Sequence, residues 1–172
     1  MNQQLPNLYE NSGYQFERRE RKTLLLDIVN DTSAKGGSST SLSGNDQLFA
    51  VELHEPLRID KLSDIYLDSF TTFNAKNNRT SPNIAFVLGI DQFNINSNST
   101  KDSKLFNKII IPNDATSNSE ARVHKGKKMN YICSINPETL TTISGSITDL
   151  AGSESFASNG RFIAEFVIIA RD

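Results

Sequence analysis

RFIAEFVIIA, residues 161–170, is the most apolar stretch of this 172-residue chain, and its pattern decides the fold. Between Phe162 and Ala170 the only charged residue is Glu165, so apolar side chains fill both sets of alternating positions. A strand with two apolar faces is typical of the interior of a sheet, where both faces are covered. The stretch therefore predicts a central β-strand and raises the question of where its neighbours lie.

The segments upstream repeat their apolar residues with the period of two that is typical of half-buried strands. Pro56 interrupts one such run, which continues with Leu57 and Ile59. The expected strands cover residues 23–29, 47–54, 62–73, 84–90, 105–111, 129–135, 140–150 and 161–170. No segment of ten or more residues has a helical period with caps. We therefore predict an all-β fold: an antiparallel two-sheet β-sandwich, arranged as a single jelly roll of about eight strands.

The domain organisation follows from shifts in composition. Residues 1–22 are polar and end in a charged run, which predicts an N-terminal arm. Residues 23–172 are predicted to form one jelly-roll domain, as the length also suggests. Within that domain, residues 31–46 are predicted to form a flexible loop rich in Gly and Ser, with Leu42 as its one bulky apolar residue.

Charge and cysteine usage exclude some partners. The net charge of −2 gives no overall basic field, so nucleic acid is not a favoured partner. No apolar stretch approaches the ~20 residues of a transmembrane helix, so no transmembrane segment is expected. Cys133 is the single cysteine and cannot form an internal disulfide. Its alternation with Tyr131 and Ile135 predicts that these three side chains share a face and that the thiol packs inward.

Residues that could carry catalysis are few. His54 and His124 are the only histidines, and neither belongs to a metal-ligand motif. We interpret His54 as a surface residue beside Glu52 and Glu55. The sequence contains no nucleophile elbow, P-loop or dinucleotide fingerprint. We therefore expect no enzymatic activity, no cofactor, no bound metal and no small-molecule substrate.

Two basic clusters are candidate partner contacts. The first contains Arg18, Arg19, Arg21 and Lys22, interspersed with acidic residues, and the second contains Lys125, Lys127 and Lys128 after His124. Such a cluster is most simply a solvated loop, and the functional alternative is contact with an acidic partner surface or a nucleic acid backbone. No aromatic residue alternates with the basic residues of 124–128, which argues against binding of single-stranded nucleic acid there.

Several phrases of residues 47–170 resemble a known family. They are LDSFTTFN (67–74), NIAFVL (83–88), FNINSN (93–98), NKIIIPN (107–113), HKGKK (124–128), YICSINP (131–137) and GRFIAEF (160–166). Together they resemble the small single jelly-roll structural proteins of large icosahedral double-stranded DNA viruses, of the penton or minor-capsid type.

The resemblance implies a subunit of the fivefold vertex of a virion capsid, made in the host cytoplasm. Its expected partners are itself, as a homopentamer, and other capsid proteins, with the N-terminal arm reaching under neighbours. The resemblance supplies no catalytic or cofactor residues.

Two other functions fit a β-sandwich. One is a carbohydrate- or receptor-binding module, such as an attachment head, for which exposed aromatic residues beside Asn or Asp in loops are expected. Tyr66 and Tyr131 fall in predicted strands instead, and the chain has no Trp. The other is a jelly-roll enzyme of the cupin-like oxygenase type, which needs more metal ligands than two histidines supply.

Overall fold

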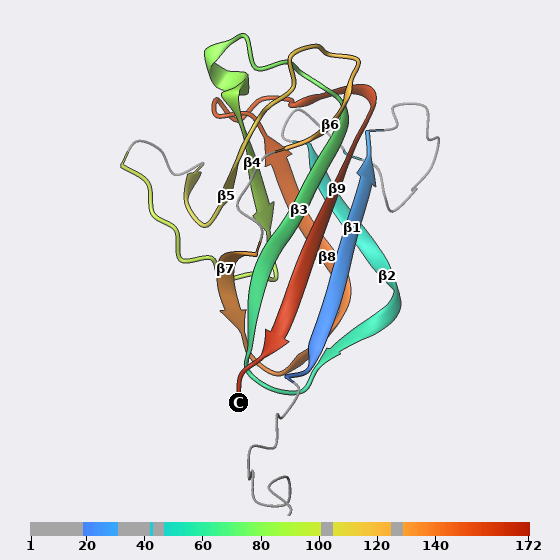
Figure 1. Ribbon diagram of the computed structural model, residues 1–172, viewed down its shortest axis with the longest axis vertical. Coiled ribbons are helices and arrows are strands. Elements are labelled where there is room, and N and C mark those ends of the chain that lie inside the picture. Colours follow the sequence, from blue (N-terminus) through green and yellow to red (C-terminus); the bar gives the residue numbers. More distant parts are fainter. Residues whose placement is uncertain (1–18, 31–41, 43–46, 101–104, 125–128) are drawn as a thin grey trace, which may run out of the picture.

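The computed structural model describes residues 19–30, 42, 47–100, 105–124 and 129–172. These residues form two antiparallel sheets packed face to face (Figure 1). The prediction of an all-β antiparallel sandwich is confirmed.

The first sheet, sheet A, has the order β1-β9-β3-β6, with β7 also paired to β3. Its strands are β1 (Arg21–Val29), β9 (Phe156–Ala170), β3 (Ser63–Ala75), β6 (Ala121–Val123) and β7 (Asn130–Ile135). The second sheet, sheet B, has the order β2-β8-β4-β5. Its strands are β2 (Leu48–Ile59), β8 (Glu138–Thr148), β4 (Ala85–Ile90) and β5 (Ile109–Pro112), and one 3-10 turn, η1 (Ser81–Ile84), precedes β4.

The strand order is that of a single jelly roll. Because β6 and β7 both pair with β3, they occupy one position at the edge of sheet A. Each sheet then has four positions, and the first four strands along the chain alternate between the sheets. Eight positions in two sheets make the double-sheet jelly roll, an architecture shared by viral capsid proteins, lectins and cupins.

The core lies between the sheets and is dominated by phenylalanine. Phe86, Phe156, Phe162 and Phe166 are all at most 1% exposed. Phe86 stacks on Phe156 with ring centroids 5.6 Å apart, and Phe93 meets Phe166 edge-on at 5.3 Å. Aromatic pairs of this kind add about 0.5–1.5 kcal/mol to the burial of their surface. The many small polar residues of the chain are therefore compatible with a dense interior.

The central position of the 161–170 stretch is confirmed, because β9 pairs with β1 on one side and β3 on the other. Val167 points away from the core and is nevertheless fully buried. Its cross-strand neighbour on β3 is Tyr66, which forms an edge-to-face pair with Tyr131. Ile163 and Ile169 on the same outer face are only half-buried, so the second face that was predicted to be covered is covered only in part.

Some predicted boundaries were wrong. The strand that Pro56 was expected to break continues through it as β2, with a register shift between Glu52 and Leu57. An edge strand tolerates such a bulge because one of its sides needs no partner. The strand expected over 105–111 begins only at Ile109, and β6 was predicted as loop.

The prediction that Tyr131, Cys133 and Ile135 share one face of their strand was also wrong. A register shift between β3 and β7 next to Tyr131 leaves this ring 52% exposed, while Cys133 and Ile135 are buried. The inward packing of Cys133 is confirmed, and burial raises the pKa of its thiol to about 11.

Strand β1 begins two residues before the predicted strand, so Arg21 and Lys22 belong to sheet A. Residues 1–18 of the predicted arm lie outside the described residues, as does most of the predicted 31–46 loop. The arm and its boundary at residue 22 stay predictions. Leu42 is buried in the core.

Candidate interaction surfaces

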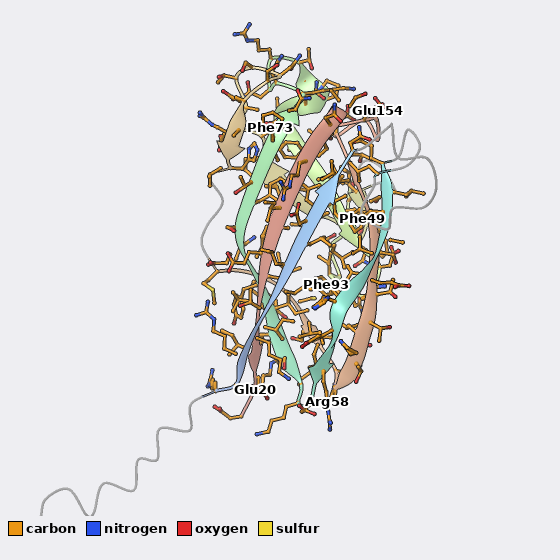
Figure 2. All side chains as sticks on the ribbon, turned by 90° about the vertical axis from the view of Figure 1, so that its right-hand side faces the viewer. Glu20, Phe49, Arg58, Phe73, Phe93 and Glu154 are labelled. Carbon is orange, nitrogen blue, oxygen red and sulfur yellow. The ribbon has the colours of Figure 1, made fainter. Side chains whose placement is uncertain are left out.

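The first predicted contact cluster lies where β1 begins, at the lower end of the sandwich in Figure 2. Arg19 forms a two-bond ion pair with Asp172, at 3.1 Å from Nε and 2.7 Å from Nη2. The pair is exposed, and the hydrogen bond to Asp172 raises the pKa of Arg19. It links the two ends of the described chain, although exposed ion pairs of this kind contribute little to stability.

Lys22 forms more contacts within the chain than Arg19 does. Its Nζ lies 2.9 Å from Glu20 and 3.6 Å from Asp60, and it also donates to the carbonyl oxygen of Arg58. Lys22 therefore joins β1 to the end of β2, and its ammonium group is already bound by groups of the same chain. Arg21 is exposed, and within the described ranges its guanidinium forms no ion pair. Of the four residues predicted for this cluster, Arg21 remains available to a partner, whereas Arg18 lies outside the described residues.

The second predicted cluster follows β6 in the sequence. Lys125, Lys127 and Lys128 lie outside the described residues, between β6 and β7. Both of these strands pair with β3, whereas β1 is the opposite edge of sheet A. Three strand spacings, about 14 Å, separate the two edges. The strands on either side of the second cluster in the sequence therefore lie at the edge opposite to β1, which carries Arg21 and Lys22.

His124 does not belong to the basic surface to which its sequence neighbours assigned it. Its side chain is 4% exposed and packs edge-on against Phe86 at 4.9 Å. Its Nδ1 accepts a hydrogen bond from the backbone N–H of Asp114 at 2.9 Å, and its Nε2 lies 2.7 Å from Thr72 Oγ1. Burial lowers the pKa of His124 to about 4, so it is neutral at pH 7.

An aromatic and polar cluster on the outer face of sheet A was not predicted. The exposed Tyr131 ring meets Tyr66 at 5.8 Å, and its hydroxyl lies 3.0 Å from Ser134 Oγ. Ser134 donates to Asp64 at 2.8 Å, and Arg171 donates to the same carboxylate oxygen from both Nε and Nη2. The hydrogen bond from Arg171 lowers the pKa of Asp64. The signal in the sequence was the presence of one tyrosine, Tyr66 or Tyr131, on each of the predicted strands 62–73 and 129–135.

The same outer face carries apolar side chains farther along the sheet. Leu25 on β1, Phe73 on β3 and Val123 on β6 are 60%, 47% and 64% exposed. Phe73 and Val123 are diagonal neighbours, because Thr71 is opposite Val123 and Phe73 is opposite Ala121. These side chains, with the half-buried Ile163 of β9 between Leu25 and the other two, form what we call the apolar face.

His54 is exposed on β2, as predicted. Within the described ranges no three His, Cys, Asp or Glu side chains gather in a way that could hold a metal ion. None of the described segments forms a helix long and apolar enough to cross a membrane.

Comparison with known proteins identifies no family for this chain. No protein-family model matches the chain, and no curated protein matches it. A solved structure of black queen cell virus aligns over 100% of this chain and 79% of the viral chain, with 8% identity and a TM-score of 0.25. At these values the alignment shows no shared family.

Proposed function

We propose that this protein is a non-enzymatic virion structural protein, a penton subunit of the fivefold vertex that acts by self-assembly and by contact with neighbouring capsid proteins. The observation that carries the proposal is the apolar face on a jelly-roll sandwich. Capsid walls are among the structures built from this architecture. Large exposed apolar patches with a polar rim mark sites of protein contact.

The composition of the apolar face favours a protein partner. Its main contact residues are Phe73, Val123 and Ile163. The ion pair between Arg161 and Asp27 lies among them, because Arg161 is opposite Phe73 and Asp27 is opposite Ile163. Interfaces between proteins combine aromatic and aliphatic contact residues with polar and charged ones.

The distribution of candidate contacts also supports a ring. A closed ring of identical subunits needs two different complementary surfaces on opposite sides of each subunit. Here the exposed Phe73 of sheet A and the exposed Ile110 of sheet B lie on the two opposite outer faces of the sandwich. Each weak contact would then be repeated five times, which stabilises the closed assembly.

The proposal is tested first by the solution mass of the purified protein, from size-exclusion chromatography with light scattering. A pentamer, or a multiple of five copies, is the expected result. Phe73→Asp should reduce the fraction of pentamer, and Thr142→Asp on an exposed position of β8 is the matched control. A strictly monomeric protein that also fails to join capsid proteins in co-expression would contradict the proposal.

A second candidate function is favoured by one observation. The exposed ring of Tyr131, beside Tyr66, Ser134 and Asp64, offers an aromatic surface next to hydrogen-bonding groups. An aromatic ring with polar neighbours is suited to bind a sugar ring, as in a carbohydrate- or receptor-binding module. Binding to a glycan array that Tyr131→Ala abolishes and Tyr131→Phe retains would support this function over the capsid role.

A further inference from the structure

Strand β1 is an edge strand whose free side is open. Its nine residues pair with β9 without any register shift. The carbonyl of Glu20 accepts from Ala170, and the N–H of Asn30 donates to Gly160. Because the backbone direction alternates in an antiparallel pair, the even-numbered residues of β1 face β9 and the odd-numbered residues face outward.

Four residues therefore point their backbone N–H and C=O groups away from the sheet: Arg21, Thr23, Leu25 and Asp27. In the described part of the chain these eight groups have no partner strand. The next outward residue, Val29, already uses its carbonyl to accept from Leu42 N–H at 3.2 Å. Figure 2 views the molecule from the side on which β1 and β2 are the edges of the two sheets.

The other edges have features that discourage pairing. Strand β2 carries a register shift next to Pro56, together with exposed Glu52 and Glu55. Strand β5 has four residues and ends in Pro112, β6 has three residues, and β7 has a register shift next to Tyr131. Bulges, prolines, charges and short length are the usual protection of sheet edges. Strand β1 is long and regular, and its Leu25 is 60% exposed.

We propose that the free edge of β1 binds the same edge of a second copy of this chain, as an antiparallel pair about a twofold axis at Leu24. In this register Arg21 is opposite Asp27 of the second copy and Thr23 is opposite Leu25. It is the one register that uses all eight free backbone groups and leaves out Val29.

The side chains are complementary in that register. Arg21, which has no ion pair within the described ranges, meets the carboxylate of Asp27, which already accepts from Arg161 and has lone pairs to share. Opposite charges directly across a strand pair stabilise it. The exposed methyl groups of Leu25 would cover the Thr23 side chain of the other copy.

This contact goes beyond the proposed vertex role and does not depend on it. A twofold contact joins copies in pairs, whereas a ring uses two different surfaces. If both exist, two rings pair into a decamer. If the vertex role is wrong, a simple dimer remains.

Engineered cysteines test the register. Cys133 is buried and its thiol pKa is raised, so the wild-type chain should not crosslink. Cα atoms of directly opposite hydrogen-bonded residues are about 5.5 Å apart, within disulfide range. Thr23→Cys and Leu25→Cys should each fail to form a dimer disulfide alone, and an equimolar mixture of the two should form it. No crosslink in the mixture, or a crosslink in Leu25→Cys alone, would overturn the proposed register.

A proline tests the edge itself. Leu25→Pro removes an N–H that faces outward and leaves every hydrogen bond to β9 in place. Light scattering across a concentration series should show the dissociation constant between copies raised by about tenfold or more, since two interface hydrogen bonds per dimer are lost. Leu25→Thr, which keeps the N–H, is the matched control. If both variants keep the wild-type mass at every concentration, or the wild-type protein still contains an odd number of copies at the highest concentration, β1 does not form the contact.

Discussion

Single buried polar side chains determine the irregular parts of this molecule. Among the described residues, Gln47, Asn30, Asn113 and His124 are buried, and each binds backbone groups of a distant segment. Backbone groups of loops need such partners when they are taken out of water. The connections between the sheets are therefore fixed by hydrogen bonds that hydrophobic patterns do not predict.

His124 predicts a specific acid sensitivity. Because its folded pKa is about 4, below the ordinary value of 6.5, its contribution to stability is complete above pH 6.5 and is lost as the pH falls from about 6.5 to 4. His124→Gln should unfold at lower urea concentration at pH 7.5 and should lose less stability than the wild type between pH 7 and 5. Urea midpoints across this range measure the effect. His54→Gln, at an exposed site, should keep the wild-type slope; an unchanged slope in His124→Gln would contradict the assignment.

The hydrogen bonds of Gln47 predict that a single substitution at this residue strongly lowers the stability of the protein. Its amide donates to the carbonyl of Phe156 at 2.9 Å and accepts from the N–H groups of Ser155 and Phe156. Gln47→Leu leaves these buried groups without partners and should lower the free energy of unfolding by about 2 kcal/mol or more. Gln92→Leu, at a half-buried site bound to Ser144, should cost less, and urea denaturation of both variants gives the comparison.

At the scale of strands, hydrophobic alternation was informative wherever one face is buried. It located β3, β4, β7, β8 and β9 to within a few residues, and it predicted β9 as central. It missed β6, whose residues are exposed or half-buried and therefore carry no alternation. It also could not predict that β2 passes through Pro56, since tolerance of a bulge depends on lying at an edge.

The pairing of β4 with β8 depends on a close approach at Gly145. A Cβ atom there would lie 2.0 Å from the carbonyl oxygen of Gly89 and 2.8 Å from Phe49 Cζ. Gly145→Ala should therefore lower the free energy of unfolding by about 3 kcal/mol, since backbone must move. Gly89→Ala is the matched control, because its Cβ would meet only the movable end of Lys108, and the expected loss is below about 1 kcal/mol. Equal losses in thermal or urea denaturation would show that the approach is not tight.

At the scale of the whole molecule, the sequence was sufficient to predict the two-sheet architecture. It was insufficient to predict which side chains the surfaces expose. The two basic clusters were recognisable, but Lys22 proved to be tied to Asp60 and Glu20, and His124 proved to be buried. The Tyr66 and Tyr131 cluster and the open edge of β1 depend on which strands become neighbours. That information arises only when residues far apart in the sequence pair, such as Tyr66 with Tyr131 and Arg21 with Ile169.

Truncation of the predicted arm should separate folding from assembly. A chain lacking residues 1–18 keeps β1 and the Arg19–Asp172 pair, so its melting temperature should match that of the full chain while incorporation into capsids falls. A chain lacking residues 1–22 also loses the contacts of Lys22 and should be less stable by about 1–2 kcal/mol. Normal incorporation of the shorter truncation would show that the arm has no role in assembly.

The pairing of β1 with β9 has a consequence for how the protein is made. In the described sheets β1 has one partner, and that partner is the last strand of the fold. At about 5–20 residues per second, the ribosome needs on the order of ten seconds to synthesise the residues between them. Throughout that interval Leu24, Leu26 and Ile28 belong to a nascent strand whose partner does not yet exist. Chaperone binding to the emerging chain should therefore concentrate on β1 and end only once β9 has been synthesised.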